Sequence, residues 1–205
     1  MAQDPGLPPT REIAVPSEDV AIDWSSCFDV TRPVEVDVGC GKGRFLLARA
    51  RRFPERQFLG IERQDARVAR IDVTARRENL ANIRLLKADA MKALTAYLPP
   101  ASVDAVYFFF PDPWPKRKHH KNRLFTPAFL EATLRLLKPY GLLHVATDRP
   151  DYGARMVALL GGDPRLRPID TFERTPDEYT DFELLFRAQN LPIHAASYQR
   201  LSPGG

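Results

Sequence analysis

Residues 34–43 read Val34-Glu35-Val36-Asp37-Val38-Gly39-Cys40-Gly41-Lys42-Gly43, a short apolar-rich run followed at once by three alternating glycines. This pattern predicts a strand that turns sharply into a helix, because glycine adopts positive φ and allows close backbone approach at little cost. The dinucleotide-binding spacing G-x-G-x-x-G is not met, since Arg44 occupies the third glycine position. A tight turn without any ligand is the alternative interpretation.

Strand-like and helix-like runs alternate beyond this turn. Strands are predicted at 57–62, 83–87, 103–110, 142–147 and 193–199, and helices at 44–53, 65–80, 90–98 and 126–137. The alternation predicts βαβ units and an α/β fold with a mostly parallel sheet. Residues 1–32 contain several prolines and are predicted to form a flexible arm with a short element around 20–28, whereas residues 33–205 form one domain.

Composition and charge are those of an ordinary globular protein. Of the 205 residues, 44% are hydrophobic and 27% are charged, which argues against a largely disordered chain. No apolar run approaches the ~20 residues that span a bilayer. Two cysteines, Cys27 and Cys40, are too few for a disulfide scaffold, so a cytoplasmic protein is expected. The net charge of +4 permits a polyanionic partner without requiring one.

Acidic residues stand at the ends of the predicted strands, where ligands of open α/β sheets bind. Glu35 and Asp37 are two apart and so point to the same face, where either carboxylate binds a cation or supports the glycine turn. Glu62 ends the next strand, where an acid accepts the hydroxyls of a ribose; a solvated acid is the alternative. Asp89 follows the third strand and either accepts from an adenine amino group or caps the next helix.

The run at 108–124, FFFPDPWPKRKHHKNRL, is the most unusual in the chain. Proline biases the residue before it away from the helical region, so Phe110, Asp112 and Trp114 are expected to be extended. An acid and an indole at the end of a central strand can recognise a flat heterocycle by hydrogen bonding and stacking. The basic side chains that follow predict phosphate contacts; they are Lys116, Arg117, Lys118, Lys121 and Arg123.

The sequence around Asp112 resembles the signature of bacterial tRNA (guanine-N7-)-methyltransferases, Phe-Pro-Asp-Pro-Trp-Pro-Lys followed by further basic residues. The resemblance continues through 137–141 (LKPYG), 146–148 (ATD) and 180–183 (TDFE), and spans residues 33 to 199. The G-x-G-x-G spacing likewise resembles the first motif of S-adenosylmethionine-dependent methyltransferases. This resemblance implies a Rossmann-like class I fold with helices on both faces of the sheet, and methyl transfer from S-adenosyl-L-methionine to guanine N7 in tRNA.

The resemblance also implies roles for individual residues. Asp112 matches the proposed catalytic residue of the family and lines its cofactor site. The further cofactor-binding residues are Glu35, Gly39, Gly41, Glu62 and Asp89. The expected substrate-binding residues are Lys116, Asp148, Thr180, Asp181, Phe182 and Glu183.

Two departures from the family pattern leave questions open. Asp37 stands where the family often has glycine, so either Glu35 or Asp37 contacts the cofactor. Asn190 replaces a usual glycine in a late turn, where asparagine tolerates positive φ. From the residues alone, Asp148 fits a helix N-cap equally well, and the Thr180-x-x-Glu183 spacing fits a capping box.

Two other functions account for parts of the sequence. A catalytically inactive RNA-binding module of the same fold would keep the basic run. A nicotinamide oxidoreductase would share Glu62, although Arg44 at the third glycine position disfavours it. No metal is expected, because neighbouring histidines such as His119 and His120 rarely reach one ion. The expected partner is tRNA, without a membrane, and the oligomeric state stays open.

Overall fold

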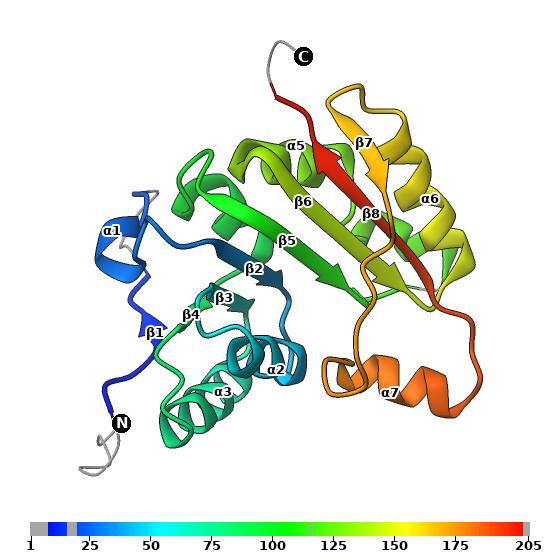
Figure 1. The fold of residues 1–205 in the computed structure, drawn as a ribbon. Coiled ribbons are helices and arrows are strands. Elements are labelled where there is room, and N and C mark those ends of the chain that lie inside the picture. Colours follow the sequence, from blue (N-terminus) through cyan, green and yellow to red (C-terminus); the bar gives the residue numbers. More distant parts are fainter. Residues whose placement is uncertain (1–7, 16–19, 115, 203–205) are drawn as a thin grey trace.

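The fold is built on one eight-stranded sheet in the order β1-β4-β3-β2-β5-β6-β8-β7 (Figure 1). It is seen in a computed structural model that describes residues 8–15, 20–114 and 116–202. Strands β1 to β6 pair parallel with one another, and β8 pairs antiparallel with both β6 and β7. The strands are β1 (Glu12–Ile13), β2 (Val34–Val38), β3 (Gln57–Glu62), β4 (Ile83–Lys87), β5 (Val103–Phe109), β6 (Leu137–Thr147), β7 (Leu166–Ile169) and β8 (His194–Arg200).

Helices cover both faces of this sheet. Helices α2 and α3 pack on one face, where Leu46 and Ile71 meet Phe58 of β3. Helices α5 and α6 pack on the other face, against apolar strand residues such as Val106 and Phe108. The helices are α1 (Trp24–Cys27), α2 (Arg44–Arg52), α3 (Asp65–Arg77), α4 (Ala90–Lys92), the π-helical turn η1 (Ala93–Tyr97), the 3-10 turn η2 (Arg117–Asn122), α5 (Pro127–Leu136), α6 (Pro150–Gly161) and α7 (Asp181–Ala188). The predicted α/β fold with a mostly parallel sheet is confirmed.

The segment predicted as a flexible arm is attached to the domain where the structure describes it. Strand β1 extends the sheet beside β4, with Glu12 opposite Leu85. The Asp72 carboxylate of α3 accepts hydrogen bonds from the Thr10 hydroxyl (3.0 Å) and from the Arg11 N–H (2.6 Å). Two-residue strands carry too little periodicity to be predicted, and their partners lie far away in the sequence.

Two further differences concern the last third of the chain. Strand β6 begins at Leu137, five residues before the predicted start at Leu142, with Tyr140 at a positive φ of 64° inside it. Its pairing with β5 shifts register between Val103 and Ala105, which accommodates this irregularity. Helix α6 and strand β7 were not predicted, and they complete the antiparallel edge of the sheet.

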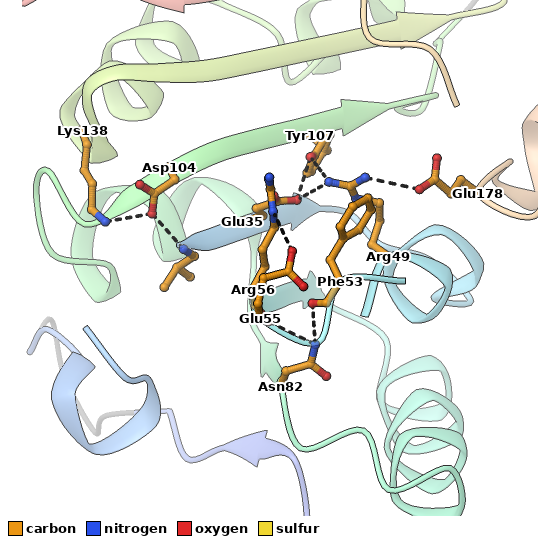
Figure 2. A network of polar contacts seen from close by, with 11 residues as sticks. Glu35, Arg49, Phe53, Glu55, Arg56, Asn82, Asp104, Tyr107, Lys138 and Glu178 are labelled. Atoms are coloured by element: carbon orange, nitrogen blue, oxygen red, sulfur yellow. Dashed lines mark hydrogen bonds and ion pairs between the residues drawn. The ribbon is translucent and has the colours of Figure 1, made fainter. Parts of the chain in front are cut away.

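A buried ion network joins the sheet to α2 and to the segment before α7 (Figure 2). The Glu35 carboxylate on β2 is 1% exposed and accepts hydrogen bonds from Arg56 (2.6 Å), Tyr107 Oη (2.7 Å) and Arg49 (3.0 Å). Arg49, on α2, also donates to Glu178 at 3.3 Å. Burial opposes ionisation, but the Arg49 charge and these hydrogen bonds lower the pKa of Glu35 below its usual value.

Arg49→Met should therefore destabilise the protein, because it leaves two buried carboxylates without their shared partner. We expect the free energy of unfolding to fall by about 3–5 kcal/mol. Arg51→Met is the matched control on the same helix, since Arg51 pairs with Glu78 at the surface with side chains 48% and 37% exposed. For Arg51→Met, the free energy of unfolding should fall by about 1 kcal/mol or less. Urea unfolding measures both, and equal losses would contradict a special role for the buried network.

Candidate active site

A cavity of about 620 Å³ lies at the carboxyl ends of strands β2, β3, β4 and β5. Its wall is completed by the amino end of α7, where Lys42 of the glycine turn lies 3.9 Å from the Asp181 carboxylate. Most of the residues predicted to form the site line this one cavity. They are Gly39, Gly41, Glu62, Asp89, Asp112, Thr180, Asp181 and Phe182.

The glycine turn has the predicted conformation. Gly39, Gly41 and Gly43 have φ values of 76°, 59° and 77°. A side chain at Gly43 would place its Cβ 2.6 Å from Ile71 Cγ1, so this glycine allows α2 to pack on α3. A Cβ at Gly39, by contrast, would have no heavy atom of the described residues within 4 Å apart from those of its two chain neighbours. The turn therefore packs closely against α3 at Gly43, whereas its backbone at Gly39 is open toward the cavity.

The structure distinguishes the two acids of β2. Asp37 lines the cavity, is 6% exposed, and its carboxylate has no hydrogen bond or ion pair within the described part of the chain. Burial, reinforced by the Glu62 charge, raises the pKa of Asp37 to about 7. Glu35 does not line the cavity, because its carboxylate is held by Arg49, Arg56 and Tyr107 behind the strand. The expectation that put Glu35 at the site is corrected in favour of Asp37.

Glu62 and Asp89 present carboxylates that the backbone holds in place. One Glu62 oxygen accepts from the N–H groups of Arg63 (2.8 Å) and Gln64 (3.0 Å), while the other lies 3.3 Å from Arg67. Asp89 caps α4 by accepting from the Lys92 N–H at 3.1 Å, and it lines the cavity as well. The cap and the cavity position, which were alternatives for Asp89, therefore occur together.

The loop after β5 differs from the expected extended conformation. Phe110 and Trp114 have positive φ values of 50° and 42°. Positive φ is unfavourable for bulky residues, so surrounding contacts must hold it. The Phe110 N–H donates to the Ala146 carbonyl at 2.8 Å, and its ring lies 5.6 Å from that of Phe186 on α7. Asp112, between these two residues, is exposed and reaches the cavity.

The basic run is only partly available for phosphate contacts. Lys116 and Lys118 are exposed, as expected. Arg123 is 3% exposed and donates to the Pro113 carbonyl (2.8 Å) and to Asp151 (2.6 Å), so it supports the loop from inside. The predicted phosphate contact of Arg123 is therefore wrong. Pro115 and the side chains at positions 117, 120 and 121 lie outside the part that the structure describes.

The predicted substrate segment begins α7. Thr180 caps the helix by accepting from the Glu183 N–H at 3.0 Å, which confirms half of the capping box. The Glu183 side chain is fully buried and pairs with Arg174 (2.5 Å) and Arg187 (2.9 Å), so it lies behind the cavity wall. Phe182 is 51% exposed at the cavity.

Two residues differ from what the sequence predicts: one expected at the site lies outside the cavity, and one that was not expected lines it. Asp148 is half-buried and does not line the cavity, and the N-cap of α6 is Arg149 rather than Asp148. Leu185, which was not predicted, lines the cavity beside Phe182. A signal for it existed, because residues three apart on a helix share a face.

Neither a metal centre nor a membrane span is found in residues 8–15, 20–114 and 116–202. No group of three His, Cys, Asp or Glu side chains among them is placed to hold a metal ion. None of their helices combines the length and the apolar character that crossing a membrane requires.

Known proteins match this chain in sequence and in fold. A family model described as "Putative methyltransferase" matches residues 31–195. A tRNA (guanine-N(7)-)-methyltransferase of Leifsonia xyli is 37% identical over 183 residues, which cover 81% of each chain. One of Halorhodospira halophila is 39% identical over 160 residues, 78% of this chain and 69% of the relative.

Solved structures agree with the fold at low sequence identity. The 16S rRNA methyltransferase KamB has a TM-score of 0.63 at 16% identity, over 86% of this chain and 90% of that one. A SAM-dependent O-methyltransferase of Thermotoga maritima has a TM-score of 0.57 at 13% identity, over 84% and 61% of the two chains. The fold is thus that of the Rossmann-like class I methyltransferases, and with its sequence relatives the chain belongs to the family of tRNA (guanine-N(7)-)-methyltransferases.

Proposed function

We propose that this chain transfers a methyl group from S-adenosyl-L-methionine to N7 of a guanine in tRNA. The observation that carries the proposal is the juxtaposition, in one cavity, of an open glycine turn, acids from three successive strands and Asp112. Membership of the family supports the reaction and its substrate. We further propose that the reaction takes place in the cytoplasm, where tRNA is found.

The residues at the cavity fit the cofactor. Asp37 is a buried carboxylate without a partner among the described residues, which suits the ammonium group of the methionine part. Glu62 and Asp89 line the same cavity, and we propose that Glu62 accepts the hydroxyl pair of the ribose and Asp89 the amino group of the adenine. The open backbone at Gly39 and Gly41 leaves room for the cofactor between these acids.

The reaction depends on the alignment of the two reactants more than on proton transfer. When bound, the cofactor supplies a methyl group on a positively charged sulfur, which N7 attacks with its free lone pair while the carbon–sulfur electron pair returns to sulfur. Since N7 carries no proton, the chain needs no general base and has mainly to bring the two reactants together. Asp112 stands at the cavity end of β5, where its carboxylate can accept from the guanine N–H groups and orient the base.

The surface beside the cavity suits a polyanion. Lys116 and Lys118 are exposed just beyond Asp112, and Thr180, Asp181 and Phe182 line the cavity at the start of α7. We propose that the lysines contact tRNA phosphates and that the α7 border contacts the target nucleotide. Glu183 contributes by fixing α7 from beneath, and Asp148 is proposed to act further along the RNA.

Transfer to bulk tRNA tests the function directly. The protein is incubated with S-adenosyl-L-methionine carrying a labelled methyl group and with tRNA that lacks guanine methylation, and the labelled nucleosides are identified. We expect 7-methylguanosine as the labelled product, and tRNA already saturated with 7-methylguanosine as the control should take up no label. Cofactor binding without transfer would support the inactive RNA-binding module instead, and label at another atom would contradict the proposed chemistry.

Asp112→Asn should affect turnover more than binding, because it keeps shape and one acceptor but removes the charge. If the carboxylate acts in the transition state, the single-turnover rate at saturating substrates should fall by a factor of about 10² or more, with little change in tRNA affinity. Lys116→Ala should show the reverse, since a phosphate contact is equally strong before and during the reaction. A near-normal rate for the Asp112→Asn enzyme would remove Asp112 from catalysis.

The salt dependence of tRNA binding tests the exposed lysines. Each phosphate contact adds about 0.7–0.9 to the slope of log affinity against log salt, so Lys116→Ala with Lys118→Ala should lower the slope by about 1.5. Lys138→Ala is the control, because Lys138 lies near the amino end of β6 and pairs with Asp104 at 2.8 Å. Filter binding from low to high salt measures the slopes. Identical slopes for the double variant and the unchanged protein would show that these lysines face away from RNA.

A further inference from the structure

The two tryptophans of the chain occupy opposite environments. Trp24 is 9% exposed and packs in the core, with its ring centroid 4.5 Å from that of Phe28. Trp114 is 36% exposed, lines the cavity two residues beyond Asp112, and has a positive φ of 42°. Indole is the largest side chain, and burial usually stabilises it. A strained backbone that leaves an indole at the mouth of a catalytic cavity points to a ligand for its ring.

A second exposed ring borders the same cavity. Phe182 of α7 is 51% exposed, and its inner neighbour is Phe186, with centroids 6.1 Å apart and planes at 16°. Trp114 has a different neighbour in His119, whose ring lies 5.8 Å away at 85°. The two exposed rings therefore come from two of the segments that line the cavity, the loop after β5 and α7. Exposed rings at such a cavity fit a flat base that leaves its stack and is bound by an aromatic side chain.

The positive charge of the methylated base favours Trp114 over Phe182 as the ring that contacts it. Guanine loses no proton when N7 is methylated, so the positive charge that leaves the cofactor sulfur remains on the base. Among aromatic side chains, indole attracts a cation over its face most strongly. Trp114 is two residues from Asp112, where the reacting base is proposed to lie, whereas Phe182 has the weaker π-face.

We propose that Trp114 stacks on the target guanine and stabilises the positive charge that develops on the base as N7 is methylated. This proposal rests on the proposed function and adds a second group to the catalytic site. Asp112 would orient the base through its edge, and Trp114 would act on its face. The methylated base should accordingly bind against Trp114 more tightly than the unmethylated one.

Fluorescence tests the contact without turnover. Trp24→Phe leaves Trp114 as the only tryptophan, because the chain has two. We expect tRNA carrying 7-methylguanosine to quench the emission of this variant more strongly than the same tRNA without the methyl group. Emission that neither tRNA changes, although both bind, would overturn the stacking.

Fluorinated tryptophans test the charge effect, because fluorine weakens the π-face with little change in size. In the Trp24→Phe protein, the single-turnover rate should fall stepwise as fluorines are added to Trp114. Trp114→Leu should lower the rate by about 3- to 30-fold, and Trp114→Phe should lie in between. The matched control is the Trp114→Phe protein with fluorinated Trp24, whose rate should not change along the series.

The outcomes separate this proposal from the proposed function. A flat fluorine series in a protein that forms 7-methylguanosine would overturn the role of Trp114 and leave the function intact. A protein that forms no 7-methylguanosine in tRNA would overturn the proposed function first.

Discussion

Three buried acids on the neighbouring strands β2 and β3 need a compensating charge or hydrogen bond, and the partners that they find connect the parts of the cavity. A buried carboxylate without a partner is unfavourable by several kcal/mol. Glu35 is compensated by two arginines and a tyrosine, and Glu62 by two backbone N–H groups and Arg67. Asp37 has no such partner among the described residues, although it is almost as buried. The cavity therefore contains one carboxylate without a protein partner among the described residues, and a cationic ligand can supply that partner.

The compensation of Glu35 also connects the two walls of the cavity. Helix α2 starts at the glycine turn, and its Arg49 reaches Glu178, two residues before the cap of α7 (Figure 2). Tyr107, which donates to Glu35, stacks on His144 with ring centroids 5.2 Å apart. Burial lowers the pKa of His144 to about 4, so it is neutral at pH 7 and adds no charge beside the arginine. The helix that shapes the cofactor side thus also holds the segment that borders the substrate side.

Many features of the fold and of the site could be predicted from the sequence, because they depend on residues that are close together in the chain. The parallel strands have apolar or alternating runs, the glycine turn has its spacing, Glu62 ends its strand and Asp89 lies just beyond its own, so each was predicted from neighbouring residues. Partners that lie far apart in the sequence could not be predicted in this way. Arg49 and Glu178 are 129 positions apart, and no local pattern pairs them. The predicted phosphate contact of Arg123 was wrong for the same reason, since Asp151, the partner that buried Arg123 reaches, lies 28 residues away. The choice between Glu35 and Asp37 likewise depended on which of them the distant arginines reach.

We propose that Asp37 is held ready for the cationic group of the cofactor, and the titration of Asp37 tests this most directly. The carboxyl carbon of Asp37 can be followed by NMR against pH in the free protein and in the complex with S-adenosylhomocysteine, with Asp37→Asn identifying the signal. We expect the pKa of Asp37 to be about 7 in the free protein and well below that in the complex, so that binding releases a proton below pH 7 and tightens as the pH rises. An ordinary pKa in the free protein, or one that the ligand leaves unchanged, would contradict it.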